Sequence, residues 1–176
     1  MVQSSNSQVL VDLAYFILRY YLSPMVANSA PVLVRGEKLV DSGRFFIDGK
    51  PVFGSHKTWE GFTAGLIMGF MSSSIIGIIF ESLYTTLLNM AGVVTALAGD
   101  LAGAFLKRRL NLKPGDPLPV VDQLDFAVAS TLLYFLLDRD FASQPLLIAI
   151  SLLVIFLLHI ATNNIAFALR LKNKRW

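Results

Sequence analysis

The chain has 176 residues, of which 55% are apolar and only 15% carry a charge at neutral pH. A soluble domain has about 25% charged residues on average, so this composition excludes an ordinary soluble or disordered protein. A mean hydropathy of +0.61 indicates that much of the surface faces lipid. The chain contains no cysteine, which excludes a disulfide framework, a thiolate metal site and a cysteine nucleophile.

Five apolar stretches follow one another along the chain, and each predicts a helix in the membrane. At about 20 residues per span, five spans take about 100 residues and leave no room for a sizeable soluble domain. We therefore predict an all-α, polytopic membrane protein with five transmembrane helices, forming a single transmembrane domain over residues 1–176. The stretches are residues 8–27, 62–81, 84–106, 124–137 and 144–167. The fourth is short, so we expect that helix to begin below the membrane surface.

The basic residues indicate how these spans are oriented. All of them except Arg19 and Arg139 fall between the first and second spans, between the third and fourth, or after the fifth. Lysine and arginine concentrate in cytoplasmic loops, so we predict an external N-terminus and a cytoplasmic C-terminus. Two cytoplasmic loops, about residues 32–61 and 107–123, are then available to build a site. This topology explains the net charge of +3 without a nucleic-acid partner.

Three carboxylates lie near the cytoplasmic ends of the third and fourth predicted spans. Asp100 precedes Lys107 by two helical turns, which places both on one helix face. Asp122 and Asp125 are three residues apart, on one side of the first turn of the fourth helix. The sequence therefore predicts an acidic cluster recessed at the cytoplasmic end of the bundle.

Two interpretations of this cluster remain open. The acids can form separate structural ion pairs with Lys57, Lys107 or Arg108, or complement the dipole of the fourth helix. Alternatively they form a Mg²⁺ site, because Mg²⁺ prefers carboxylate oxygens and bridges to phosphate oxygens in phosphoryl or nucleotidyl transfer. Gly99 and Gly103 leave room beside the acids for a ligand or for another helix.

The end of the first long loop has the composition of an anion site. Residues 54–61 read Gly-Ser-His-Lys-Thr-Trp-Glu-Gly, and Ser55 or Thr58 can cap the second helix. Free backbone N–H groups at this helix start, together with the charge of Lys57, favour phosphate binding. The other interpretation is an ordinary capped turn with Trp59 at the membrane interface.

Weaker signals lie within the first and last stretches. Pro31 stops the first helix, and Asn28 just before it offers a side-chain amide to a headgroup or a base; a simple helix stop is the alternative. Arg19 is a candidate buried cation without an evident partner. His159 and Asn163 lie four residues apart on one face, which favours an interhelical hydrogen bond.

Glycines at four-residue spacing mark the start of the second span. Gly61, Gly65 and Gly69 form a small-residue stripe that lets a neighbouring helix approach closely. We interpret the stripe as a packing surface.

These motifs together resemble a known enzyme family. Residues 99–108, 118–119 and 122–125 resemble the C-terminal signature of the CTP-dependent phosphatidate cytidylyltransferases, the CDP-diacylglycerol synthases, and residues 55–61 are similar to their Ser-Pro-Lys-Lys-Thr-x-Glu-Gly motif. The short chain, the five spans, Asn28-Ser29-Ala30-Pro31 and the form of residues 119–125 look closest to the smaller branch, the CDP-archaeol synthases.

The resemblance implies a reaction in the cell membrane. A cytidylyl group would pass from CTP to an isoprenoid ether lipid phosphate, 2,3-bis-O-(geranylgeranyl)glycerol 1-phosphate, with release of pyrophosphate and with Mg²⁺ as cofactor. In this hypothesis Asp100, Asp122 and Asp125 hold the metal and act with Lys107 in catalysis at a site that faces the cytoplasm. The candidate contacts to CTP and phosphates are Lys57, Thr58, Asn28, Pro31, Gly99, Gly103, Arg108 and Gln123.

The sequence also departs from the larger enzymes. Ala104 replaces a family serine, Gln123 stands where they have arginine, and their Pro-Gly-His-Gly-Gly run is missing. The contacts that those parts supply must come from elsewhere, and Lys57, Lys107 and Arg108 are the candidates.

Two rival functions use the same residues. A CTP-dependent lipid kinase would move the γ-phosphoryl group onto a prenol and release CDP. A non-catalytic lipid carrier or scramblase would use the buried acids to gate headgroups and would not turn over nucleotide. Neither rival, nor the main hypothesis, requires a nucleic acid or an identified protein partner.

Overall fold

The computed structural model describes residues 2–168, and the described chain is helical. Its only β-type pairings are isolated bridges, so the all-α prediction is confirmed for this part of the chain. The elements are α1 (Val2–Tyr20), α2 (Leu22–Ser29), the 3-10 helix η1 (Ala30–Leu33), α3 (Trp59–Ile79), α4 (Leu83–Arg109), α5 (Val121–Leu137), α6 (Arg139–Ala142) and α7 (Pro145–Ala168).

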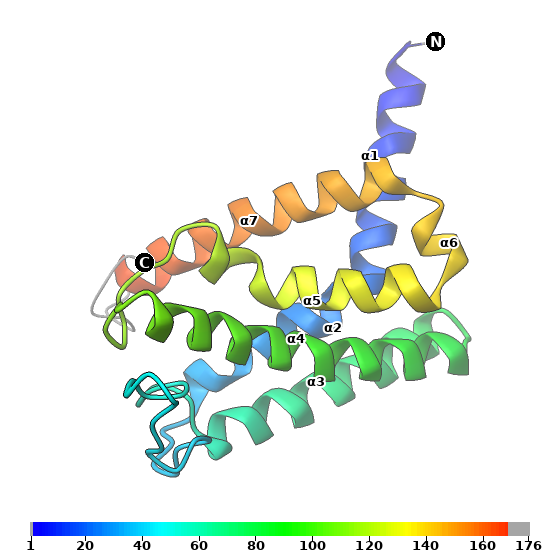
Figure 1. Ribbon diagram of the computed structural model, residues 1–176. Coiled ribbons are helices and arrows are strands. Elements are labelled where there is room, and N and C mark those ends of the chain that lie inside the picture. The colour runs from blue at the N-terminus through cyan, green and yellow to red at the C-terminus, as the bar shows by residue number, and fades with distance from the viewer. Residues whose placement is uncertain (1, 169–176) are drawn as a thin grey trace.

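Four long helices form the body of the molecule. α4 packs between α3 and α5, and α7 packs on α5, so that these helices run side by side (Figure 1). α2 crosses this layer on one side, in contact with α3 and α4, while the N-terminal part of α1 extends away from it (Figure 1). The turn between α5 and α7 is made by α6, at the end of the bundle opposite to the long loop.

The apolar length of the helices supports a membrane protein. Among residues 2–168, three helical segments are long and apolar enough to cross a membrane: Trp59–Ile79, Leu83–Arg109 and Pro145–Ile165. A fourth is possible if the pair Ser7–Tyr20 and Leu22–Leu33, bent by 55°, counts as one span. The five-span count and the orientation of the termini stay predictions.

Two helices differ from simple spans. The first apolar stretch is bent at Tyr21 instead of forming one straight helix, and η1 follows with Pro31 in its first turn. α5 has 17 residues, which agrees with the prediction of a helix shorter than a full crossing.

The glycine stripe of α3 does pack against its neighbours. A Cβ atom at Gly65 would lie 2.9 Å from the carbonyl oxygen of Ala27, and one at Gly69 would lie 2.6 Å from a methyl group of Val93. Because real Cβ atoms do not approach other atoms this closely, only glycine lets α2 and α4 reach α3 here. The interpretation as a packing surface is confirmed.

The long loop, residues 34–58, is organised around one buried carboxylate. Asp41 accepts hydrogen bonds from the backbone N–H groups of Gly43, Phe53 and Gly54, at 2.9, 2.9 and 3.0 Å. Burial alone would raise the pKa of Asp41, but these backbone donors outweigh it and hold the pKa below its ordinary value. The carboxylate thereby fixes the segment that leads to Lys57.

Candidate active site

The start of α3 brings a lysine to the middle of α4. Thr58 is the N-cap of α3, and its Oγ1 accepts a hydrogen bond from the N–H of Gly61 at 3.3 Å. The preceding residue, Lys57, extends to Asp100, with Nζ 2.6 Å from both carboxylate oxygens. A capped helix start and a helix interior thus meet in a salt bridge between groups 43 residues apart.

A second salt bridge joins α4 to α5. Nζ of Lys107 lies 2.9 Å from both carboxylate oxygens of Asp122. Asp122 also accepts the backbone N–H of Leu118 at 2.9 Å, which ties down the proline-rich loop before α5. The ion pairs foreseen in the first interpretation of the acidic cluster are therefore present for two of its three members.

The third carboxylate fills the space beside the α4 glycines. A Cβ atom at Gly103 would overlap the Asp125 carboxylate, and one at Gly99 would lie 2.6 Å from the Asp125 carbonyl oxygen and from Cβ of Ala129. Of the two uses predicted for this space, the structure shows the helical one: α5 occupies it. Gly99 and Gly103 permit the close contact that places Asp125 near Asp100, and the substrate contact predicted for them would have to displace α5.

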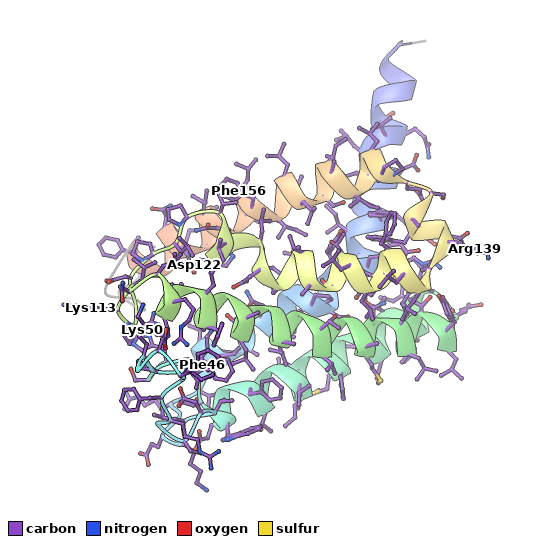
Figure 2. The ribbon with its side chains drawn as sticks, viewed as in Figure 1. Phe46, Lys50, Lys113, Asp122, Arg139 and Phe156 are labelled. Carbon is purple, nitrogen blue, oxygen red and sulfur yellow. The ribbon has the colours of Figure 1, made fainter. Side chains whose placement is uncertain are left out.

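These acids line one cavity of about 260 Å³. Two basic ion-pair partners and a buried arginine line it as well, so the cavity wall carries charges of both signs. Its charged lining is Lys57, Asp100, Lys107, Arg108, Asp116, Asp122 and Asp125, and its other polar side chains are Asn28, His56, His159 and Asn163. Figure 2 shows Asp122 at the same end of the bundle as Lys50 and Lys113, away from Arg139.

Two of the predicted substrate residues are almost fully buried. Arg108 is 5% exposed and lines the cavity, and its Nε has no hydrogen-bond partner among the described residues. Gln123 is 2% exposed, and its Oε1 also has no hydrogen-bond partner among the described residues. Unpaired buried polar atoms are costly, which makes Arg108 a candidate to bind a ligand group in the cavity, whereas Gln123 does not line that cavity.

The remaining predicted residues surround adjoining spaces. Thr58 and Pro31 line a second cavity of about 280 Å³, which shares Lys57 and Asp100 with the first. Asn28 lines the first cavity and also a largely apolar groove of about 480 Å³ between α2, α5 and α7.

The polar cavity and the apolar groove have side chains in common. Asn28, His159 and Asn163 line both. Nδ1 of His159 also lies 3.4 Å from the carbonyl oxygen of Gln123, so the predicted contact of this residue with another helix is confirmed. Its position at the edge of the charged cavity was not foreseen.

Sequence reasoning gave no role to several residues of the cavity wall. Phe53, His56 and Asp116 come from the two long loops and were given no role, yet all three line the cavity. The only available signal was their position within loops that also carry Lys57 and Asp122. Which loop residues turn inward depends on contacts between the loops, such as the close approach of Gly115 to His56.

Arg19 acquires an aromatic environment remote from this site. Its guanidinium lies 5.2 Å from the ring centroid of Tyr20 and 5.8 Å from that of Phe80. Such contacts stabilise a cation in an apolar setting and answer the question of its partner.

The side chains of the cavity include ligands that suit a magnesium ion. Among residues 2–168, no three His, Asp or Glu side chains are arranged to hold one metal ion together. Mg²⁺ does not need such a cage, because it is commonly held by one or two carboxylates together with waters and substrate phosphates. The carboxylates that line the cavity fit that mode of binding.

Comparison with known proteins identifies the family. The family model described as CarS-like, CDP-archaeol synthase, matches residues 8–176. The chain belongs to the CDP-archaeol synthase family. A CDP-archaeol synthase of Staphylothermus marinus is 53% identical over 163 residues, covering 92% of this chain and 93% of the relative. One from Pyrobaculum islandicum is 40% identical, covering 94% and 100%.

A solved structure shares the fold of this CDP-archaeol synthase family member. It is described as an intramembrane enzyme for archaeal membrane lipids biosynthesis, and it matches with a TM-score of 0.76 at 31% identity, covering 86% of this chain and 94% of that one. The chain is therefore an enzyme of the nucleotidyltransferase type that resides in a membrane. The resemblance noted from the motifs is confirmed, and the synthase function is favoured over the lipid kinase and the lipid carrier.

Proposed function

We propose that the chain transfers the cytidylyl group of CTP to an isoprenoid ether lipid phosphate, 2,3-bis-O-(geranylgeranyl)glycerol 1-phosphate, to give CDP-archaeol and pyrophosphate. The observation that carries this proposal is the junction of a charged cavity with an apolar groove along the wall formed by Asn28, His159 and Asn163. The charged side suits a nucleoside triphosphate, and the apolar side suits isoprenoid chains. Their meeting point is where a lipid phosphate would face the nucleotide.

The reaction requires no general base. The lipid phosphate is an anion at neutral pH, so one of its oxygens can attack the α-phosphorus of CTP directly. A new phosphorus–oxygen bond forms to the α-phosphorus, the bond from the α-phosphorus to the bridging oxygen breaks, and pyrophosphate leaves with that electron pair. The protein then has to align two anions and stabilise the charge that builds on the leaving group.

Basic side chains supply this stabilisation in the proposal. Lys57, Lys107 and Arg108 line the cavity from separate positions on α4 and the long loop. Each lysine is held by one carboxylate, and all four side chains keep some contact with solvent, between 14% and 26% exposure, so each lysine can exchange that partner for phosphate oxygens. The buried Nε of Arg108 adds a donor that has no competing partner among the described residues.

The two carboxylates released in this exchange, together with Asp125, are the proposed metal ligands. Asp100, Asp122 and Asp125 would hold Mg²⁺ with one or two of the three carboxylates at an ion and the phosphates of CTP as further ligands, and the bound metal would neutralise phosphate charge and favour departure of pyrophosphate. Asp100 and Asp122 serve first as counter-ions that position the lysines, and Asp125 is fixed beside them by the α4 glycines.

We further propose that the chain lies in the cell membrane with five spans, an external N-terminus and a cytoplasmic C-terminus. The distribution of lysine and arginine supports this orientation. It opens the charged cavity toward the cytoplasm, where CTP is made. α5 would be the fourth of these spans despite its 17 residues.

Turnover measured with two separately labelled forms of CTP tests the function. Purified protein in lipid vesicles is supplied with CTP labelled at the α- or the γ-phosphate and with a panel of acceptors: the isoprenoid ether lipid phosphate, a diacyl phosphatidate and a prenol. The proposal expects α-label in the lipid product and pyrophosphate in solution. Transfer of γ-label to a lipid with release of CDP would instead identify a kinase, and lipid movement without nucleotide turnover would identify a carrier.

Two variants in this assay distinguish loss of a cavity carboxylate from loss of a carboxylate elsewhere on the protein. Asp125→Asn changes a cavity carboxylate, whereas Asp140→Asn changes an exposed one in α6 at the opposite end of the bundle. We expect only the first to lose turnover. Omission of Mg²⁺, followed by its return, is expected to stop and restore the reaction.

A further inference from the structure

One surface of the long loop is apolar and uncovered, and it lies away from the cavity. Phe45 and Ile47 are 68% and 95% exposed, and Phe46 between them is 42% exposed. These three residues, here called the apolar tip, end a small hairpin that is closed by the bridge between Phe45 and Pro51. A run of exposed apolar residues at a loop tip is unfavourable in water and marks a contact surface.

The apolar tip is held against α4. The ring of Phe46 packs edge-on against Phe105, with centroids 5.2 Å apart. Arg109 lies over both rings, at 5.0 and 4.5 Å, and pairs with Asp48 at 3.2 Å. The tip therefore has a defined place beside the last turns of α4 (Figure 2).

That place adjoins the apolar outer face of a membrane helix. Ala98 and Ala102 are exposed on α4, and Val94 one turn earlier is 46% exposed, which marks an outward stripe along the helix. Phe105 follows Ala102 at the next turn, and Phe46 covers it. Phe105 also lies four residues before Arg109, about 6 Å along the axis from the end of the helix. The tip thus continues the lipid-facing stripe and does not project straight into water.

The surroundings of the tip suit a membrane surface. Arg44 beside it is exposed, whereas the charge of Asp48 is matched by Arg109. Trp59, at the start of α3 from the same loop, is 49% exposed, which is typical of an aromatic side chain at the interface between lipid and water.

We propose that the apolar tip inserts into the headgroup region of the same leaflet and anchors the long loop to the bilayer. The occupant of this surface is lipid. The anchor also bears on the charged cavity, since the same loop leads through the Asp41 hydrogen bonds to Lys57. The proposal is independent of the reaction that the enzyme catalyses.

Site-directed spin labelling tests the anchor directly, because the chain has no native cysteine. Ile47→Cys carries the label at the tip, and Glu37→Cys, exposed and polar in the same loop, is the matched control. Ile78→Cys, on the exposed face of α3, is the lipid reference. The full chain is reconstituted in vesicles of phosphatidylcholine and phosphatidylglycerol in equal parts, and collision with oxygen and with a water-soluble nickel chelate is measured for each label.

Each outcome has one meaning. We expect the ratio of oxygen to nickel collisions at the Ile47 label to be several-fold above that at the Glu37 label and to approach that at Ile78, and the Glu37 label to collide mainly with nickel. An Ile47 label that resembles the Glu37 label would place the tip in water and overturn the proposal. A label shielded from both reagents would mean that a second copy or another protein covers the tip, and would overturn it equally.

Hydrogen exchange gives a second measurement with a different substitution. Ile47→Asp places a charge at a side chain with little packing to lose. In vesicles we expect exchange at the hairpin N–H groups of Phe46 and Val52, which bond to Lys50 and Arg44, to rise several-fold. Unchanged exchange at these groups would contradict insertion.

Discussion

The two ends of the helical bundle bury polar groups in opposite ways. At one end, side chains from the long loop, α4 and α5 form the salt bridges around the charged cavity. At the other end, Asp138 caps α6 by accepting the N–H of Phe141 at 3.0 Å, and the hydroxyl of Tyr20 donates to the same carboxylate at 3.4 Å. This second end is the aromatic cluster, which comprises Phe16, Tyr20, Tyr21, Tyr134 and Phe141.

The difference lies in exposure and in the kind of partner. Lys57 and Asp100 retain 26% and 25% side-chain exposure, and each is held by a flexible side chain from another segment. Asp138 is 4% exposed, and one of its partners is backbone. Solvated ion pairs between side chains exchange partners easily, whereas a buried carboxylate with fixed donors does not. The charged end is therefore suited to binding, and the aromatic end to holding the helices in place.

The largest expected effect lies in the aromatic cluster. Phe141→Ala empties a position with 0% exposure between Phe16 and Tyr20, and we expect it to lower the free energy of unfolding by about 3 to 5 kcal/mol. Thermal unfolding in detergent measures this. Phe135→Ala, at a position 56% exposed on α5, is the control and should change stability little. A large loss of turnover per folded molecule in Phe141→Ala would contradict the assignment of the aromatic end to stability alone.

At the charged end, removal of a cation should affect rate and not stability. Lys107→Met deletes the charge opposite Asp122, and we expect turnover to fall on the order of 100-fold, as for the loss of one donor to a developing anion. Lys113→Met, exposed in the adjoining loop, should retain activity. The measurement is the steady-state turnover rate of each variant at the same concentration of folded protein. Equal rates for the two variants would show that Lys107 does not take part in the cytidylyl transfer.

A pair of substitutions separates a structural salt bridge from a working one. Asp100→Asn should reduce turnover by about 10-fold or more, as is common when a group that supports a metal is lost. If Asp100 and Lys57 only hold α3 against α4, the double variant Asp100→Asn with Lys57→Met leaves no unpaired charge and should recover. We expect no recovery, and a double-mutant cycle on turnover and on unfolding reports both quantities.

The smallest expected effect is a local dependence on pH. Because backbone donors hold the pKa of Asp41 below its ordinary value, its charge stabilises the long loop above about pH 4. That contribution should be lost as the pH falls through the lowered pKa, since protonation then accompanies loss of the native hydrogen bonds. Hydrogen exchange at Phe53 and Gly54 should rise on acidification, and Asp41→Asn should show fast exchange at every pH. Slow exchange in the variant would mean that Asp41 does not organise the loop.

Much of the bundle could be predicted from local sequence. The helices α3, α4 and α7 follow from apolar stretches flanked by charge, and Thr58 was correctly identified as a possible cap. The bend at Tyr21 was not predicted, although Pro24 lacks the backbone N–H that would bond to the carbonyl of Tyr20 four residues earlier. Sharp helix bends commonly occur just before a proline, so the local sequence did carry a signal for this one.

The candidate site was predicted in its members but only partly in its arrangement. The three carboxylates and the basic residues were identified, whereas their pairing was not, because Lys57 meets Asp100 across 43 residues and Lys107 meets Asp122 across 15. The space beside Gly99 and Gly103 was equally open to a ligand or to a helix until the position of α5 was known.

By itself the sequence determined that the chain is a helical membrane protein, because the free energy of transferring side chains from water to lipid adds up residue by residue. It also determined which family the chain resembles, because the family motifs are short stretches of neighbouring residues. Only the tertiary structure decided which acid faces which base, that the apolar groove adjoins the charged cavity, and that His56, Asp116 and His159 belong to its wall. Those outcomes depend on how closely helices distant in sequence can approach, and that distance is set by the shapes of all the residues between them.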